Sequence, residues 1–478
     1  MELSWACGPI GRNLLRISSA AILVAGAAAC APEPPPAEHT VARHAILIVI
    51  DTLRADRVGY MGADRATSPR VDQLARDGTS FLRAYANSPW TVPSTATILT
   101  SLYPSEHGAE VIGDVRNLAE MPPRQIHAAV RSVGEILQES RFRCGLFSAN
   151  PYLFGRFKDG YDTAFVDRQS ATTITDLALE YIASVQGDRF FVHIQYMDLH
   201  PPIEPPAPYF NLFPTPEAGP RGERHKEWAF SRGRDLSSDE FVEFRDNKLA
   251  LYDGALRYID DEIGRLMDTL ESLGILEDTL IVVTSDHGEE FWDHAELEAF
   301  LGGDPRGYYG IGHGHTLFQE LLRVPLLFFG PGASPGLTVD DPVSLLDLAP
   351  TMLGLLDVRI PEQMRGKNLQ SVNGGGKMKT PISTPIYAES PAYGPSAWCL
   401  IEGGRKFIAR DDGVRLLYDL VSDPRETHDL ASDNPELGQE MQDRLDSFRS
   451  TLAPVGPTDS MNIDGRTEEQ LRALGYVE

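Results

Sequence analysis

From residue 44 onward the sequence alternates short apolar runs with longer amphipathic segments, and this rhythm constrains the fold more than any other feature. Runs of this length are typical of buried strands, and the segments between them are long enough for helices. The pattern predicts an α/β fold with a mainly parallel sheet flanked by helices on both faces. The clearest strands are expected at 45–50, 143–149, 189–194, 279–285 and 324–329.

The longest helix is expected to end before residue 274. Its apolar side chains recur at steps of three and four residues, which places them on one face. Ser237 and Glu240 have the spacing of a capping box at its start, and Gly274 is a stop signal at its end.

The rhythm changes after about residue 375. Four short strands are expected near 386–389, 398–402, 406–409 and 416–419, with GGR and DDG turns typical of antiparallel hairpins. A further helix is predicted to start at Asn434–Pro435. We therefore divide the chain into a main α/β domain at 44–375 and a small C-terminal α+β subdomain with an antiparallel sheet at 376–478.

The first residues have the features of an export signal. Arg12 and Arg16 precede an apolar segment, Ile17–Ala29, which ends just before Cys30. The segment is short for a bilayer span, and VAGAAAC resembles a bacterial lipobox with alanine where leucine is commoner. We expect a signal peptide at 1–29, a Pro-rich tether at 30–43 and a protein exported and lipid-anchored to the bacterial cell envelope, with no other membrane contact. A buried core helix is the alternative.

Composition narrows the classes of partner. The formal net charge is −26, which argues against nucleic-acid binding and means that an anionic substrate would need local cations. Of the four cysteines, Cys7 would leave with the signal and Cys30 would carry lipid. Cys144 and Cys399 then indicate neither a disulfide framework nor a cysteine metal site.

Two expected strands end in acidic residues. The run AILIVI leads into Asp51, and TLIVVTS leads into Asp286 and His287. Ligands bind beyond the carboxyl ends of the strands in an open parallel sheet, so both aspartates should reach the functional edge. Most strand-end aspartates only cap loops, but the joint occurrence with DHGEEF favours a site.

Thr91 is the third candidate. It precedes Pro93 and the small-residue run STATILTS, so its hydroxyl is expected at the positive end of a helix, where anions bind. The simpler alternative is that Thr91 is an N-cap.

Ordered motifs over residues 44–478 together resemble the sulfatase-like branch of the alkaline phosphatase superfamily. They are IDTLRADRVGYMG, TVPSTATILTSLYPSEHG, YMDLHPP, TSDHGEEF, GHGHTLFQELLRVPLLFFGPG, SLLDLAPT, LYDLVSDPRETHDLA and LRALGYV. The resemblance implies an alkaline-phosphatase-like fold and an ester hydrolase.

The resemblance also implies residue roles. Thr91 would be the nucleophile and a metal ligand, together with the ligands Asp51, Asp286 and His287. His200 and His313 would contact the reacting group of the substrate or its leaving group. Arg54 would bind substrate, although a structural salt bridge is an equal alternative. His294 and His315 would support the site indirectly or be exposed, and the role of Asn150 stays open.

The departures from the family pattern define the predicted chemistry. Typical sulfatases have Cys-x-Pro-Ser-Arg, whose cysteine becomes formylglycine, whereas this chain has Thr91-Val92-Pro93-Ser94-Thr95. His287 also stands where a calcium-type sulfatase often has asparagine. An imidazole ligand favours zinc or manganese over calcium, and such an ion can lower the pKa of a bound hydroxyl. Threonine is thus predicted to act unmodified.

We therefore expect a hydrolase with one divalent metal ion that cleaves a sulfate, phosphate or phosphonate ester. The substrate would be a small anionic ester or a glycan- or lipid-linked one. A second metal at Asp198, His200 and His313 is possible but disfavoured, because Asp198 and His200 are too close in sequence. The alternatives are transfer of the phospho group to an acceptor hydroxyl and a non-catalytic binding lipoprotein.

Overall fold

The computed structural model describes residues 41–111, 118, 121–213, 235–371, 385–456 and 458–473. The predicted signal peptide, Cys30 and most of the tether lie outside the described residues, as does the predicted boundary at 375. None of the helices in the described ranges combines the length and the hydrophobicity needed to span a bilayer.

The predicted central sheet is present and is mixed, with mainly parallel pairs. Its strand order is β10-β2-β9-β6-β1-β5-β3-β4, and β11 pairs with β2. Strand β1 pairs in parallel with both β5 and β6, whereas β9 is antiparallel to β2 and β6. The strands are β1 (His44–Ile50), β2 (Thr79–Tyr85), β3 (Arg143–Ser148), β4 (Thr163–Val166), β5 (Phe190–Tyr196), β6 (Thr279–Thr284), β9 (Arg323–Phe329), β10 (Leu337–Val339) and β11 (Val343–Ser344).

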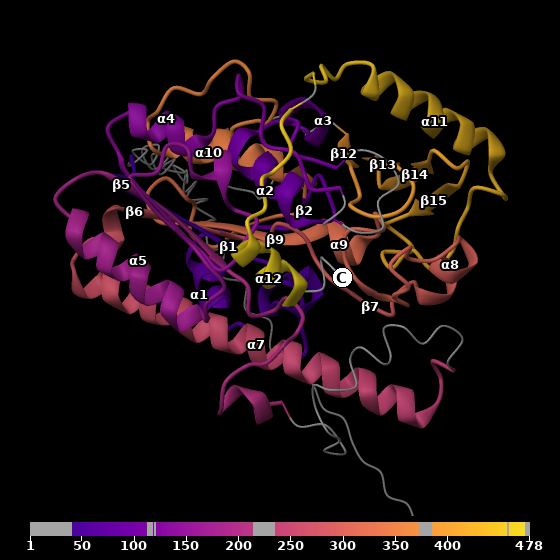
Figure 1. Cartoon of the computed structure of the whole chain (residues 1–478), viewed down its shortest axis with the longest axis horizontal. Coiled ribbons are helices and arrows are strands. Elements are labelled where there is room, and N and C mark those ends of the chain that lie inside the picture. Colours follow the sequence, from indigo (N-terminus) through magenta and orange to yellow (C-terminus); the bar gives the residue numbers. More distant parts are fainter. Residues whose placement is uncertain are drawn as a thin grey trace, which may run out of the picture. The chain divides into compact units, whose positions relative to one another are not determined.

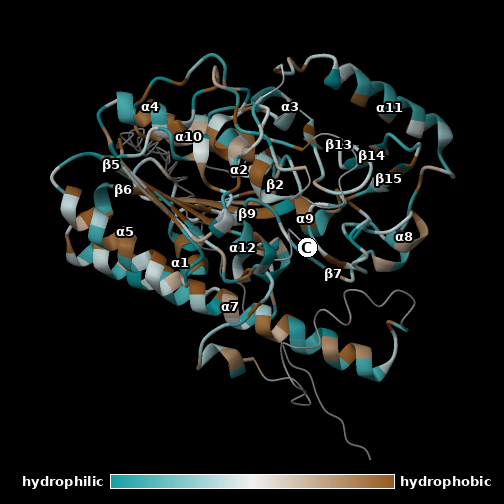
Figure 2. Ribbon diagram, viewed as in Figure 1, coloured by the Kyte–Doolittle hydropathy of each residue, from teal (hydrophilic) through white to brown (hydrophobic). Residues whose placement is uncertain are grey.

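Helices cover both faces of this sheet, as Figure 1 shows. One face carries α1 (Pro69–Asp77), α5 (Ala171–Val185) and α7 (Asp239–Ser272); the other carries α2 (Thr91–Thr100), α4 (Val133–Glu139) and α10 (Leu348–Leu355). Because helices shield both faces, every residue of β1, β5 and β6 is buried. Figure 2 shows the apolar strands in brown between helices whose outward sides are teal.

The long helix α7 differs from its prediction by one residue at the start. Its N-cap is Ser238, whose side chain accepts a hydrogen bond from the Phe241 N–H. Ser237, the predicted cap, instead donates its hydroxyl to Asp235 at 2.6 Å. At the other end Gly274 has a φ of 70°, so its role as the stop residue is confirmed.

The predicted antiparallel sheet in the C-terminal region is also present. It has the order β12-β13-β14-β15, formed by β12 (Ile386–Glu389), β13 (Ala397–Glu402), β14 (Arg405–Arg410) and β15 (Arg415–Asp419). Helix α11 (Pro435–Arg449) packs against it, with Asn434 as N-cap and proline in its first turn.

A long loop region between β6 and β9 carries most of the remaining short elements. They are β7 (Glu290–Phe291), α8 (Ala295–Phe300), β8 (Ile311–Gly312) and α9 (Gln319–Leu322). Two further short helices, α3 (Pro104–His107) and α12 (Gly465–Ala473), lie elsewhere in the chain. Cys144 and Cys399 are buried free thiols.

Candidate active site

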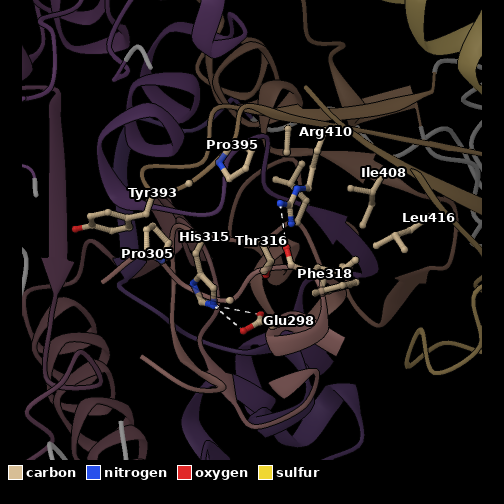
Figure 3. Close-up of a pocket in the computed structure, with 15 residues that line it drawn as sticks. Glu298, Pro305, His315, Thr316, Phe318, Tyr393, Pro395, Ile408, Arg410 and Leu416 are labelled. Atoms are coloured by element: carbon tan, nitrogen blue, oxygen red, sulfur yellow. Dashed lines mark hydrogen bonds and ion pairs between the residues drawn. The ribbon is translucent and has the colours of Figure 1, made fainter. Parts of the chain in front are cut away.

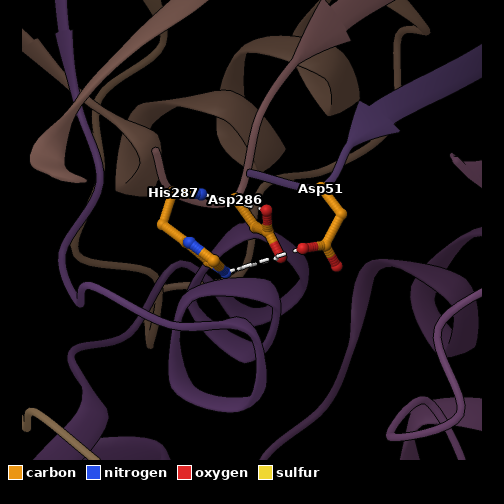
Figure 4. A group of neighbouring side chains, drawn as sticks. All are labelled: Asp51, Asp286 and His287. Carbon is orange, nitrogen blue, oxygen red and sulfur yellow. Dashed lines mark hydrogen bonds and ion pairs between the residues drawn. The ribbon is translucent and has the colours of Figure 1, made fainter. Parts of the chain in front are cut away.

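The carboxyl ends of β1 and β6 bring the predicted acidic residues together. Asp51 follows β1 directly, and Asp286 and His287 lie just after β6. Because the two strands are parallel neighbours, they end at the same edge of the sheet. Figure 4 shows the three side chains pointing toward one another, and their ligand-type atoms all lie within 4.8 Å.

Thr91 joins this group from the first residue of α2. Its Oγ1 lies 3.5 Å from Asp51 Oδ2 and 3.3 Å from His287 Nε2. The N-cap of α2 is Trp90, and no side chain caps the helix, so the N-cap interpretation of Thr91 is wrong. The hydroxyl instead faces the carboxylates and the imidazole. Ser94 fixes the start of α2 against the loop, since its hydroxyl donates to the Asp286 carbonyl at 2.5 Å.

The ring of His287 is held in one orientation. Its Nδ1 lies 2.8 Å from the Gly288 carbonyl oxygen, which can only accept a hydrogen bond. The Nδ1 position therefore carries the proton, and the lone pair of Nε2 is directed at the group. Burial lowers the pKa of this imidazole, which keeps it neutral. A neutral ring with a fixed Nε2 lone pair is what a metal ligand requires.

The two carboxylates are fully buried and close in space. Burial, together with the charge of Asp286, raises the pKa of Asp51 to about 7. Burial likewise raises the pKa of Asp286 to about 7. In addition, Asp51 Oδ1 has no hydrogen-bond partner among the described residues. Among the described residues no Lys or Arg forms an ion pair with either carboxylate, so a bound cation would offset the cost of burying them.

Two amide side chains support the carboxylates, and the sequence did not assign either. Asn150 Nδ2 donates to Asp51 Oδ2 at 2.6 Å and to Thr91 Oγ1 at 3.3 Å. Gln195 Nε2, from β5, lies 3.2 Å from Asp51 Oδ2 and 3.4 Å from Asp286 Oδ2. The signal for Gln195 was its position directly after the strand expected at 189–194, at the same edge as Asp51.

This donor set fits one divalent cation. A tetrahedral ion with bonds of about 2.1 Å separates its ligand atoms by about 3.4 Å. His287 Nε2 lies 3.3 Å from the Thr91 hydroxyl, 3.6 Å from Asp286 Oδ2 and 3.8 Å from Asp51 Oδ1. Asp51 Oδ1, which has no hydrogen-bond partner among the described residues, and the mixture of oxygen and nitrogen donors agree with the binding of one divalent cation.

His313 and His200 lie beside the group. The ring centroid of His313 is 4.5 Å from that of His287 and 4.9 Å from that of His200. His313 Nδ1 lies 2.8 Å from Oε2 of the buried Glu289, and His200 Nδ1 lies 2.8 Å from the Pro201 carbonyl. Burial holds the pKa of both imidazoles well below the ordinary value. Glu289 is a further residue that the sequence analysis did not assign.

Arg54 is engaged in structural ion pairs. Its guanidinium contacts Asp293 at 2.6 Å and Asp56 at 2.7 Å and also donates to the Glu289 carbonyl. All of its N–H donors have protein acceptors, which agrees with the salt-bridge interpretation rather than substrate binding.

The other predicted residues lie apart from this group. Asp198 accepts a hydrogen bond from the Ala171 N–H at 3.2 Å and forms no ligand-distance cluster with His200 and His313 among the described residues. His294 is buried, so the expectation that it could be exposed is wrong; its Nδ1 lies 2.7 Å from Glu320. His315 faces Glu290 and Glu298.

The fold and the gathered site define a metal-compatible ester hydrolase of the sulfatase type. A sequence description of the sulfatase family matches residues 43–358, so the chain belongs to this family. The class of enzyme is therefore a sulfuric or phosphoric ester hydrolase.

Known proteins resemble the chain over most of its length. Arylsulfatase K of Bos taurus is 24% identical over 465 residues, covering 85% of this chain and 82% of that protein. A protein solved with its substrate D-glucosamine-2-N,6-O-disulfate has a TM-score of 0.68 at 18% identity, over 86% of this chain and 98% of that one. The phosphonate monoester hydrolase of Agrobacterium radiobacter has a TM-score of 0.65 at 20% identity, over 85% and 95%. These structural likenesses establish the fold.

Proposed function

We propose that this protein is a metal-dependent hydrolase of an anionic ester, with the unmodified Thr91 hydroxyl as its covalent nucleophile. The observation that supports the proposal is the approach of the Thr91 hydroxyl to His287 Nε2 and Asp51 Oδ2, at 3.3 and 3.5 Å. Asp51, Thr91, Asp286 and His287 would hold one divalent ion. When bound, that ion would lower the pKa of the hydroxyl and offset negative charge on the substrate.

The protein residues would divide the reaction into two displacements. In the first, Thr91 Oγ1 forms a bond to the phosphorus or sulfur centre while the bond to the ester oxygen breaks. The hydroxyl proton has Asp51 as an acceptor. The departing alkoxide takes a proton from His200 or His313, whose protonated form the negative charge of the bound substrate would stabilise against the effect of burial. In the second, water gives a proton to the histidine that was deprotonated in the first step and attacks the same centre, the bond to Oγ1 breaks, and Asp51 returns its proton to the threonine oxygen. Glu289 would orient His313 and stabilise its protonated form.

Phosphate and phosphonate esters are supported at least as strongly as sulfate esters. Threonine cannot be converted to formylglycine, and the chain has no cysteine at position 91. An imidazole among the ligands favours zinc or manganese over calcium. The fold shared with a phosphonate monoester hydrolase is compatible with this substrate class. A small anionic ester or a glycan- or lipid-linked ester is the substrate that we propose.

The cellular location is proposed from the sequence alone. The lipobox-like VAGAAAC and the Pro-rich segment after Cys30 favour export and lipid anchoring to the bacterial envelope. Mass spectrometry of the N-terminal peptide tests this proposal: a diacylglyceryl adduct on Cys30 is expected, and an unmodified N-terminus starting at Met1 would contradict it.

A substrate panel tests the proposed reaction. Nitrophenyl sulfate, phosphate monoester, phosphate diester and phosphonate are assayed with zinc, manganese or calcium, with and without an acceptor alcohol. We expect turnover of at least one ester with zinc or manganese and water as the acceptor. Predominant transfer to the alcohol would favour a transferase. A protein that turns over none of the esters and binds no divalent ion would be a non-catalytic family member.

A further inference from the structure

A second group of metal-type side chains lies in the loop region between β6 and β9. Glu290 opens β7, Glu298 lies in α8, and His315 follows β8. His315 Nε2 is 3.1 Å from Glu290 Oε2 and 3.2 Å from Glu298 Oε1, and all three donor atoms lie within 4.8 Å of one another. Figure 3 shows His315 directed at Glu298 at the wall of a cavity. We call Glu290, Glu298 and His315 the loop cluster.

The loop cluster is buried and its hydrogen bonding is incomplete. The side chains are 0%, 6% and 3% exposed for Glu290, Glu298 and His315. Glu298 Oε2 is hydrogen-bonded to the His315 ring at 3.3 Å, whereas Oε1 has only the ion-pair contact with that ring and no hydrogen bond among the described residues. A buried carboxylate oxygen without a hydrogen-bond donor is costly unless a cation completes its environment.

The carboxylates of the loop cluster outnumber the cationic side chains that contact them among the described residues. Asp304, which lies 3.8 Å from His315 Nδ1, is paired with Arg306 at 2.6 Å. Against the effect of burial, the charges of Glu298 and Asp304 raise the pKa of His315 well above its ordinary value, so without a metal its imidazolium offsets only one of the two charges of Glu290 and Glu298. A divalent ion bound in place of the His315 proton would match both carboxylates.

A second buried cluster of the same composition shows the contrast. His294, Glu320 and Glu426 also place their donor atoms within 4.8 Å of one another. There, however, Lys406 Nζ lies 2.6 Å from Glu426 and His294 lies 2.7 Å from Glu320. Two cationic side chains thus balance two carboxylates, and this cluster needs no metal.

We propose that Glu290, Glu298 and His315 bind a divalent cation of the zinc class at a site separate from Asp51, Asp286 and His287. The distances of 3.1 and 3.2 Å from His315 Nε2 to the two carboxylates are close to the separation of about 3.4 Å in a tetrahedral zinc site. Mixed imidazole and carboxylate donors suit zinc or manganese.

A cavity next to the loop cluster supplies the remaining coordination position. Its volume is about 40 Å³, and Glu298, His315 and Thr316 are among the residues that line it. This volume exceeds the 10–15 Å³ or so that one water molecule needs. The hydroxyl of Thr316 is buried without a hydrogen-bond partner among the described residues, so it is available to a water bound there.

The ion would fix the segments that carry the His313–Glu289 hydrogen bond. Glu290 follows Glu289, and His315 lies two residues after His313. A metal bridging Glu290 and His315 would therefore hold both backbones in place, so the loop cluster would position His313 without contacting substrate. This consequence rests on the proposed function, whereas the metal site itself does not.

Zinc stoichiometry of the purified full-length protein tests the site. After loading with zinc and gel filtration, elemental analysis should give two ions per chain. Glu298→Gln and His315→Gln should each remove one ion, and Asp51→Asn should remove the other. His294→Gln is the matched control and should keep both. A wild-type protein that holds one ion, lost in Asp51→Asn and kept in Glu298→Gln, would overturn the proposal.

A second measurement does not depend on the variants folding. Crystals of the wild-type protein are soaked in zinc, and anomalous maps are recorded above and below the zinc edge. A peak between Glu298 and His315 supports the loop-cluster site even if the Asp51 group is empty. No peak there at full zinc occupancy of the Asp51 group refutes it. Circular dichroism of each variant shows whether a lost ion reflects lost ligands or lost structure.

Discussion

The hydroxyl of Thr91 lies 3.3 Å from Nε2 of His287, although the two residues are 196 positions apart in the chain. The start of a helix and the end of a strand meet at this point. Because the hydroxyl makes no capping hydrogen bond in its own helix, its position is explained by the side chains that it faces. This relationship makes residue 91 the most informative position to change.

Removal of the Thr91 hydroxyl should abolish turnover. Thr91→Val keeps the shape of the side chain but has no nucleophilic oxygen, so we expect kcat to fall by at least about 10³-fold. Thr91→Ser, the matched control, retains the oxygen and should stay within about tenfold of the wild type. Steady-state kinetics on the best nitrophenyl ester measures both. Full activity in Thr91→Val would exclude the covalent mechanism.

Metal removal should inactivate the enzyme and lower its stability. A chelator leaves Asp51 and Asp286 buried without a counter-ion, so both activity and melting temperature should fall. Zinc or manganese should restore both, and calcium should not. An ion at about 100 times its Kd contributes about 2.7 kcal/mol to stability, which thermal unfolding detects easily. Undiminished activity of metal-free protein, verified by elemental analysis, is the contrary result.

Gln195 should tune metal affinity. Its amide donates to both Asp51 and Asp286, at 3.2 and 3.4 Å, and so fixes the position of one carboxylate relative to the other. Gln195→Met keeps the side-chain length but removes the donor. We expect the Kd for zinc to rise by about 10- to 100-fold, measured by competition with a chelating dye. An unchanged Kd would mean that the amide has only a packing role.

Glu289 should affect kcat more than KM. Its carboxylate contacts His313 Nδ1 at 2.8 Å and so orients the ring that we propose to contact the reacting group. Glu289→Gln should lower kcat by about 10- to 100-fold with little change in zinc content. The exposed Glu296 on α8 provides a control, because Glu296→Gln should leave kcat unchanged. A rise in KM alone would argue against a role in the chemical step.

His294 should make stability depend on pH. The charge of the neighbouring Glu320 raises the pKa of the His294 imidazole from its ordinary value of 6.5 to about 10, against the effect of burial. The stabilisation is thus complete below pH 6.5 and is lost as the pH rises through about 10. Between these values the free energy of unfolding should fall by at most about 1.4 kcal/mol per pH unit.

His294→Gln provides the comparison for this dependence. Urea unfolding of the wild type and the variant at pH 6.5, 8 and 9 should show a decline in the wild type that is absent or much shallower in the variant. Parallel curves for the two proteins would show that another group causes the decline.

Five strands of the central sheet, β1, β3, β5, β6 and β9, could be predicted within one or two residues because burial leaves continuous apolar runs, whereas β2, β4, β10 and β11 were not predicted. The start of α7 was misplaced by one residue because Ser237 and Ser238 both precede an acidic turn, and sequence spacing does not distinguish which hydroxyl reaches the helix. Only the path of the chain around Asp235 decides between them.

The ligand-type residues at strand ends could be predicted, but their supporting side chains could not. Gln195 lies beside Val49 through the pairing of β5 with β1, and this register is not encoded in local periodicity. Glu289 and the loop cluster depend on the course of the loop region between β6 and β9, whose short elements have no clear pattern. Contacts between distant loops arise from packing, which spacing in the sequence does not report.

The parallel register of β5, β1 and β6 has an evolutionary consequence. Val49 pairs with both Gln195 and Thr284, so one rigid edge carries the metal-type ligands that follow these strands. A shift of one residue in the pairing of these strands would turn their side chains to the opposite face of the sheet. Small successive mutations therefore can hardly change the positions of the ligands at this edge. New substrate preferences would therefore have to arise by exchange of the surrounding loops, and loop grafting between relatives is the engineering route that leaves the reactive centre intact.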